Sequence, residues 1–247
     1  MSTPGGASGF VDIASTGSAA LHGYLAVPDG AGGRPGVVLV HEAFGLDEVM
    51  RRHADRLAAA GYLTLAVDLY TLGGPARCLV ATMRALLRGR GRAFADIEAA
   101  RQHLVASAQC TGRVGVIGFC MGGSFALMTA STGFAAASVN YGPLPRDLEE
   151  AVAGACPVVG SYGGADRTLR GAATTLDLAL TTAGVEHDIT EYPGAGHSFL
   201  NDAETGPRVL RPLLRVSGIG PEPVAAADAW ARIEAFFAAH LRDRPAG

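Results

Sequence analysis

A cysteine, an aspartate and a histidine occur in this 247-residue chain in an order that suits nucleophilic catalysis. Cys120 is the centre of the turn Gly-Phe-Cys-Met-Gly at 118–122, between an apolar segment and a predicted helix, which is the context of a nucleophile elbow. The partial positive charge at the start of a helix favours the thiolate form of such a cysteine. These five residues alone fit a structural cysteine in a tight glycine turn equally well.

Two later loops contain the partners that a nucleophile needs. Asp166 ends the turn Tyr-Gly-Gly-Ala-Asp after one predicted strand, and His197 follows Pro-Gly-Ala-Gly after the next. Loops after parallel strands share one edge of a sheet, so we expect Cys120 to attack a carbonyl carbon, His197 to shuttle the proton and Asp166 to orient the imidazole. Taken singly, Asp166 fits a turn former and His197 a solvated loop residue. Together, in this chain order, they favour a hydrolase.

The loop 41–46 follows the first long apolar run and is predicted to supply part of an oxyanion hole. The backbone amides of Ala43 and Met121 are the candidate donors to a developing oxyanion. Phe44, in the same loop, is a candidate substrate contact. Glu42 is a carboxylate directly after an apolar strand. It is predicted either to hydrogen-bond the thiol of Cys120 or to pair with an arginine. The alternative interpretation of Glu42 is a surface acid.

The segments that must position these residues alternate between apolar runs and amphipathic stretches. Predicted strands lie at 10–13, 20–27, 36–41, 62–67, 114–117, 136–140, 157–161 and 187–191, and predicted helices at 47–60, 76–106 (one or two helices), 121–131, 146–153, 169–183 and 224–241. The first two strands are expected to be an antiparallel pair. The remaining alternation predicts an α/β chain with a mostly parallel sheet and helices on both faces, forming a single domain over 1–247 in which 1–9 is flexible.

Composition excludes several chemistries. All 20 basic residues are arginines, which rules out a Schiff-base lysine, a pyridoxal phosphate anchor and a P-loop lysine. A formal charge of −3 favours neither nucleic acid nor an anionic membrane as a partner. Four scattered cysteines without a CxxC pair indicate no metal site and no disulfide framework. The chain starts without a signal-peptide pattern and contains no long apolar run, so a cytoplasmic location is expected.

Five segments together resemble the dienelactone hydrolase family: Glu-Ala-Phe-Gly at 42–45, Asp-Leu-Tyr at 68–70, Gly-Phe-Cys-Met-Gly-Gly at 118–123, Gly-Gly-x-Asp at 163–166 and Ala-Gly-His-Ser-Phe at 195–199. The resemblance covers residues 36–200 in the family's order. It implies an α/β-hydrolase fold with eight strands and a triad of Cys120, His197 and Asp166. It also implies that Glu42 contacts the resting thiol and helps to activate it when an anionic substrate binds, and that Tyr141 lies in the pocket.

One position departs from the pattern of the best-studied branch, which binds a substrate carboxylate with two arginines. The first arginine lies in the helical region before the nucleophile, where Arg84, Arg88, Arg90 and Arg92 are candidates. The second lies four residues after the histidine, where this chain has Asn201. The resemblance therefore implies a hydrolase but leaves specificity for dienelactones open.

The segment 201–223 is long for a connection and contains Arg208, Arg211 and Arg215 among glycines and prolines. Loops of this length are typically functional or disordered. One hypothesis is a flap whose arginines replace the missing anion clamp. The competing interpretation is a solvated surface excursion.

These features predict a hydrolase that cleaves an ester or lactone bond of a small molecule through a thioester on Cys120, with no cofactor and no metal. The substrate is expected to carry a carboxylate if one of the arginines binds it, and the protein is expected to be a monomer or small homo-oligomer. A thioesterase or general carboxylesterase with the same triad is one alternative. A non-catalytic, redox-responsive protein in which Cys120 is a sensor thiol is another, although such a protein needs neither His197 nor Glu42.

Overall fold

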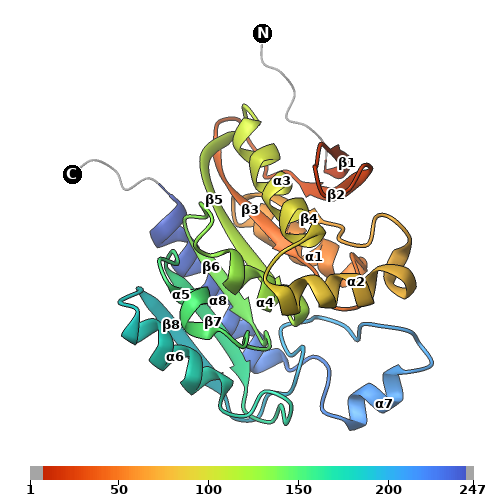
Figure 1. Cartoon of the computed structure of the whole chain (residues 1–247), viewed down its shortest axis with the longest axis vertical. Helices are drawn as coiled ribbons and strands as arrows, with labels where there is room; N and C mark the ends of the chain where they lie inside the picture. The colour runs from red at the N-terminus through yellow and green to blue at the C-terminus, as the bar shows by residue number, and fades with distance from the viewer. Residues whose placement is uncertain (1–7, 243–247) are drawn as a thin grey trace.

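The computed structural model describes residues 8–242, which are built around one eight-stranded sheet (Figure 1). Its strands are β1 (Gly9–Ile13), β2 (Leu21–Ala26), β3 (Arg34–Val40), β4 (Leu63–Val67), β5 (Cys110–Phe119), β6 (Ala137–Asn140), β7 (Val158–Gly163) and β8 (His187–Tyr192). They lie in the order β1-β2-β4-β3-β5-β6-β7-β8. Strand β2 pairs antiparallel with β1 and β4, and all other neighbours are parallel. The predicted mostly parallel sheet with an antiparallel pair at its start is confirmed.

Helices cover both faces of the sheet, as predicted. They are α1 (Glu48–Ala59), α2 (Gly74–Arg88), α3 (Arg92–Ala106), α4 (Met121–Thr129), α5 (Leu148–Val152), α6 (Ala172–Thr182), α7 (Arg211–Val216) and α8 (Pro223–Leu241). On one face α1 packs beside α8, where Arg56 forms an ion pair with Glu234. Helices α2 to α6 lie on the opposite face (Figure 1).

The stretch 76–106, for which one or two helices were predicted, is two helices, because Gly89 adopts the left-handed conformation (φ 64°) and caps the end of α2. Some predicted boundaries were wrong. Strand β5 begins at Cys110, four residues before the prediction, because it continues beyond its apolar run into an exposed end. Helix α6 begins at Ala172, three residues after the prediction. Gly9, expected to be flexible, begins β1, while the rest of the segment 1–9 lies almost entirely outside the described residues.

The central strands hold the loops that follow them in fixed positions. Strand β4 is buried at every residue, and β3 from its second residue onward, so their apolar runs pack against helices on both faces. Strand β8, at the edge, consists of half-buried and exposed residues. The carboxyl ends of β3, β5, β7 and β8 therefore project from a rigid layer, and the loops with candidate residues follow these ends.

Part of the segment 201–222 leaves this layered body. It contains the short helix α7, which the sequence did not predict and which projects outward in Figure 1. Apolar side chains on and before α7, including Val209 and Val216, are exposed. Among the helices within residues 8–242, none combines the length and the apolar character required to cross a bilayer.

Candidate active site

Cys120 lies in a strained turn between β5 and α4. Its backbone has φ 54°, a left-handed conformation that few residues other than glycine adopt. The turn is possible only because strand and helix approach each other closely: a Cβ at Gly118 would lie 1.9 Å from the Gly122 carbonyl oxygen, and one at Gly122 would lie 2.1 Å from the Val40 oxygen. The glycines at 118 and 122 are thus required by packing, and they present Cys120 at the start of α4.

Asp166 and His197 meet at the same edge of the sheet. The Nδ1–H of His197 donates to Asp166 Oδ2 at 2.6 Å, and Thr168 donates to the other carboxylate oxygen from its amide (2.9 Å) and its hydroxyl (2.6 Å). Burial alone would raise the pKa of Asp166, but the hydrogen bonds from His197 and Thr168 outweigh it and lower that pKa. Asp166 therefore stays ionised and fixes the orientation of the imidazole ring.

His197 is held as an imidazolium by its neighbours. Burial opposes the charge, yet the hydrogen bonds to Asp166 and to the sulfur of Cys120 raise the pKa of His197 to about 10. The ring of Tyr141 packs against the imidazole with ring centroids 5.1 Å apart. The imidazole of His197 is therefore held between Asp166 and Cys120.

The two residues whose amides are predicted to form an oxyanion hole line the same cavity as Cys120. Ala43 and Met121 both line it, and Met121 is the first residue of α4, where a helix leaves its N–H groups unpaired. Within residues 8–242, neither amide has a backbone acceptor in a loop or cap. These two amides therefore stay the candidate oxyanion donors.

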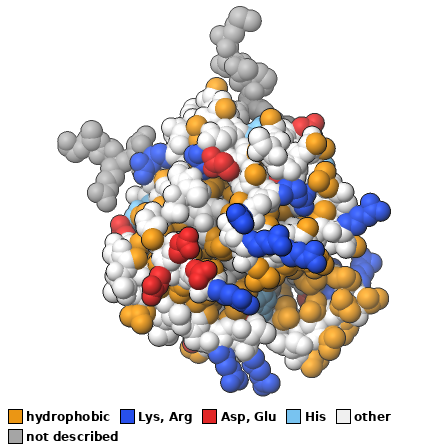
Figure 2. All heavy atoms as spheres, in the orientation of Figure 1, with side chains coloured by type: hydrophobic (Ala, Val, Ile, Leu, Met, Phe, Trp, Pro, Cys, Tyr) orange, Lys and Arg blue, Asp and Glu red, His pale blue; other side chains and the backbone are white. Residues whose placement is uncertain are grey.

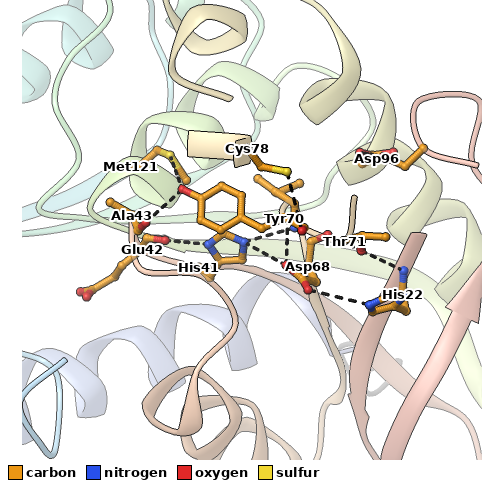
Figure 3. Close-up of polar contacts among 12 residues, drawn as sticks. His22, His41, Glu42, Ala43, Asp68, Tyr70, Thr71, Cys78, Asp96 and Met121 are labelled. Atoms are coloured by element: carbon orange, nitrogen blue, oxygen red, sulfur yellow. Dashed lines mark hydrogen bonds and ion pairs between the residues drawn. The ribbon is translucent and has the colours of Figure 1, made fainter. Parts of the chain in front are cut away.

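Two side chains to which the sequence analysis assigned no role support this loop (Figure 3). His41 is fully buried: its Nδ1–H donates to the Glu42 carbonyl oxygen at 2.6 Å, and its Nε2 accepts the Leu69 amide at 3.2 Å. Burial lowers the pKa of His41, so the ring stays neutral, as this donor and acceptor pair requires. The Tyr70 hydroxyl donates to the Ala43 carbonyl oxygen at 3.1 Å. Together these contacts fix the backbone around Ala43.

Glu42 lies in a buried cluster of hydroxyl and amide groups. Its Oε1 accepts from Ser198 Oγ at 2.9 Å and from Asn201 Nδ2 at 3.2 Å, and its Oε2 accepts from Thr205 Oγ1 at 3.2 Å. Only 3% of Glu42 is exposed, so the interpretation as a surface acid was wrong. Within residues 8–242, the contacts of this carboxylate include neither the thiol of Cys120 nor an arginine. Burial raises the pKa of Glu42. The three donors are neutral, and their hydrogen bonds do not offset this effect.

Asn201, which stands where the best-studied branch has an arginine, links Glu42 to a second buried histidine. Asn201 Oδ1 accepts from His53 Nε2 at 3.0 Å and from the Tyr141 hydroxyl at 3.4 Å, which turns its amide nitrogen toward Glu42. Burial lowers the pKa of His53 to about 4, so this ring is a neutral donor. Tyr141 thus lies beneath His197 in this network and is not among the residues that line the cavity at Cys120, contrary to its predicted pocket position.

The cavity beside Cys120 has a volume of about 600 Å³. Of the arginines proposed for substrate binding, Arg88 lines it, as does Arg90. Arg84 is exposed outside it, and Arg92 instead donates to Ser18 and to the Leu69 carbonyl oxygen. The structure therefore brings two of the four helical candidates to the cavity.

The segment 201–222 does not bring its arginines to this cavity. Arg208 is exposed and does not line it, Arg211 donates to the Gly206 carbonyl oxygen, and Arg215 pairs with Glu204. Phe44 faces the same segment, where its ring packs against Gly206, and it too lies outside the lining of the Cys120 cavity.

The segment instead forms hydrogen bonds with His197 and Glu42. The His197 amide donates to the Gly218 carbonyl oxygen at 3.0 Å, and the Gly220 amide donates to the His197 carbonyl oxygen at 2.9 Å. Thr205 contributes a hydroxyl to Glu42. These contacts were missed because nothing in the spacing of this segment marks them, whereas Ser198 and His41 are direct neighbours of predicted site residues and were detectable in principle.

Comparison with known proteins identifies the family of this chain. The dienelactone hydrolase family model matches residues 21–241. A Salmonella typhimurium protein named "Putative carboxymethylenebutenolidase" is 32% identical over 96% of this chain and 89% of its own. The crystal structure of a dienelactone hydrolase-like promiscuous phosphotriesterase from metagenomic libraries is 25% identical, with a TM-score of 0.80 over 96% of this chain and all of that chain.

A thermophilic esterase from Thermogutta terrifontis shares the fold with a TM-score of 0.69 over 96% of this chain and 92% of its own, at 17% identity. At that identity the likeness bears on the fold alone. The family match, in contrast, spans nearly all of the described residues. The chain belongs to the dienelactone hydrolase family and is a hydrolase that acts on ester bonds.

Proposed function

We propose that this hydrolase cleaves its substrate through a covalent thioester on Cys120, with His197 and Asp166 completing a triad. The observation that carries the proposal is the 2.6 Å hydrogen bond between His197 and Asp166 beside a cysteine in a strained elbow. These residues come from the loops after β7 and β8 and from the turn after β5. A binding protein has no need for a strained cysteine backed by an imidazole and a carboxylate.

In the first half of the reaction, the Cys120 thiolate attacks the carbonyl carbon and the electron pair of the C=O bond moves to oxygen. The amides of Ala43 and Met121 donate to this oxyanion, and removal of one such donor typically lowers the rate about 10²- to 10³-fold. The oxyanion then reforms the carbonyl, the bond to the leaving alkoxide breaks, and His197 gives it a proton. The products are an alcohol and a thioester on Cys120.

In the second half, the neutral His197 takes a proton from water, and the resulting hydroxide attacks the thioester carbon. Collapse of the second oxyanion breaks the carbon–sulfur bond and releases the acid. The Cys120 thiolate and the His197 imidazolium are then restored. Asp166 remains ionised throughout and holds the ring in position.

Mass spectrometry after incubation with 4-nitrophenyl acetate tests the proposal. We expect an acetyl adduct on Cys120 together with release of 4-nitrophenolate, and loss of both in Cys120→Ala. Cys110→Ala is the matched control, since Cys110 lies at the opposite end of β5. Full esterase activity in Cys120→Ala would disprove the covalent mechanism. Sulfenylation of Cys120 by peroxide without any ester turnover would instead favour a redox-responsive thiol.

A further inference from the structure

The peptide that joins Glu42 to Ala43 is held at its carbonyl oxygen. That oxygen accepts from His41 Nδ1–H at 2.6 Å and from the Gly45 amide at 3.1 Å. No peptide bond within residues 8–242 is cis, so this peptide is trans and planar, and its N–H points opposite to its C=O. The two donors on the carbonyl side therefore set the direction in which the Ala43 N–H points.

His41 is held in the tautomer that can donate to this oxygen. Its Nε2 accepts the Leu69 amide at 3.2 Å, and a backbone N–H can only donate, so the proton of the neutral ring is on Nδ1. The Asp68 carboxylate lies 3.8 Å from Nε2, beyond hydrogen-bond distance, and accepts instead from the Tyr70 amide at 2.8 Å. Because His41 is 0% exposed, bulk solvent does not reach its ring nitrogens. The donor that faces the Glu42 carbonyl is therefore fixed.

Tyr70 holds the next peptide along the chain. Its hydroxyl donates to the Ala43 carbonyl oxygen at 3.1 Å and lies 3.7 Å from the sulfur of Met121, the residue with the second candidate amide (Figure 3). The Tyr70 ring packs edge-on against His41, with ring centroids 4.7 Å apart and an angle of 62° between the planes. The peptides before and after the Ala43 Cα are therefore held by two buried side chains that also support each other.

We propose that His41 and Tyr70 are positioning residues for the oxyanion, because they aim the Ala43 amide at the oxygen that becomes charged during attack by Cys120. The proposal rests on the proposed function, in which this oxyanion forms. Neither side chain lines the cavity, so both act through the backbone of Ala43. An amide that is aimed in advance stabilises the oxyanion without reorganisation. The hydrogen bond from His41 also polarises the peptide and strengthens its N–H as a donor.

Two reactions of Cys120 test the proposal, because only one of them forms an oxyanion. Acylation by 4-nitrophenyl acetate places negative charge on the carbonyl oxygen, whereas in alkylation by iodoacetamide the thiolate displaces iodide from a saturated carbon. The ratio of the two second-order rate constants therefore measures oxyanion stabilisation, and changes in thiol reactivity cancel. Arginine side chains gather beside an apolar hollow on this face (Figure 2), and Arg88 and Arg90 line the cavity. Both reagents are neutral, so these charges do not bias the ratio.

His41→Leu removes the donor to the Glu42 carbonyl, so the ratio of acylation to alkylation should fall about 10-fold or more, toward the 10²- to 10³-fold loss that follows removal of an oxyanion donor. His41→Asn keeps an N–H near the position of Nδ1 and should restore part of the ratio. Tyr70→Phe removes only the hydroxyl. It should lower the ratio about 3- to 10-fold, the effect of one hydrogen bond between neutral groups.

His103→Leu is the matched control, because His103 is in the last turn of α3 and does not line the cavity. It should leave the ratio as in the wild type. An unchanged ratio in His41→Leu, or an equal decrease of both reactions, would overturn the proposal. If circular dichroism shows that His41→Leu does not fold, Tyr70→Phe decides in its place, and an unchanged ratio in that variant overturns the proposal.

Steady-state hydrolysis separates failure of this proposal from failure of the covalent mechanism. If the wild type hydrolyses 4-nitrophenyl acetate without an adduct on Cys120, the covalent mechanism fails. Direct attack by water also forms an oxyanion, so a kcat/KM about 10-fold lower in His41→Leu would still support the positioning role, and an unchanged value would overturn it. Acylation of Cys120 with the same ratio in the wild type and His41→Leu would overturn the positioning role and leave the covalent mechanism in place.

Discussion

Asp166 and Glu42 are two buried carboxylates with the same number of hydrogen bonds, but their pKa values are shifted in opposite directions. They are 5% and 3% exposed, and each accepts three hydrogen bonds. Yet the pKa of Asp166 is lowered, whereas the pKa of Glu42 is raised by burial. The difference lies in the donors: Asp166 faces a protonated imidazole, and Glu42 faces two hydroxyls and an amide. Burial alone therefore does not decide the charge of a carboxylate; the charge of its partner also contributes.

One turn of the chain serves both sites. His197 and Ser198 are consecutive, and Ser198 has φ 60°, a conformation that costs a residue with a side chain some strain. The two side chains thereby reach different carboxylates: His197 contacts Asp166, and Ser198 contacts Glu42. This turn thus connects the Asp166 site with the Glu42 cluster. Substitution of one carboxylate at a time should show what each contributes to activity and stability.

The largest effect is expected at Asp166. Asp166→Asn keeps the size of the side chain but removes the charge that orients His197 and favours its protonation, so kcat should fall about 10³- to 10⁴-fold. Steady-state hydrolysis of 4-nitrophenyl acetate measures it. Asp177→Asn is the control, since Asp177 is 55% exposed on α6 and pairs with His187. A decrease of less than 10-fold in Asp166→Asn would mean that Asp166 is structural.

The next largest effect is expected in stability, at Glu42. Glu42→Leu leaves three buried donors without an acceptor, and each costs about 1–3 kcal/mol, so we expect a loss of at least about 3 kcal/mol in unfolding free energy. In Glu42→Gln the hydroxyls of Ser198 and Thr205 can rotate to accept, so the loss should stay within about 1 kcal/mol. Urea unfolding compares the two variants. Equal stability of the two variants would show that the residues around Glu42 do not need an acceptor at this position.

A smaller effect is expected in how stability depends on pH, with opposite signs for Glu42 and Asp166. The pKa of Glu42 is raised in the folded state, so its contribution to stability is full below about 4.5 and is lost as the pH rises through the folded value. The pKa of Asp166 is lowered, so its contribution is present above about 3.8 and is lost as the pH falls through the folded value.

Unfolding free energies measured from pH 3 to pH 8 test this contrast. The difference between wild type and Glu42→Gln should fall with rising pH, with a slope of at most about 1.4 kcal/mol per pH unit. Below pH 5, the difference between wild type and Asp166→Asn should rise with pH. Slopes of the same sign would contradict the assignment of opposite shifts.

The smallest effect is expected from the outward segment. Its link to the site passes through the Thr205 hydroxyl and the backbone around His197, and Arg208 does not line the cavity. Arg208→Ala should therefore change the KM for an anionic ester by less than about 2-fold, while Thr205→Val should lower stability by about 1 kcal/mol. A 10-fold rise of KM in Arg208→Ala would restore the hypothesis of an arginine flap.

The candidate nucleophile and its partners were predicted from local sequence. The glycines around Cys120 mark the elbow because a strand and a helix can approach so closely only without side chains. Asp166 and His197 were found because loops after parallel strands share one edge. The partners of Glu42 were not found, because Ser198, Asn201 and Thr205 lie 156 to 163 residues away along the chain. The distinction between Arg88, which lines the cavity, and the exposed Arg84 was also missed, because it depends on how α2 packs over α4.

The sequence by itself determined the chemistry available: a cysteine in a glycine turn, one aspartate and one histidine in later loops, and arginine as the sole basic residue type. The order of strands and helices followed from apolar periodicity, which is a local property. Only the tertiary structure decided which carboxylate faces a cation and which faces neutral donors. Both the burial of a carboxylate and the charge of its partner arise from segments that are distant in the chain, and together they determine its protonation.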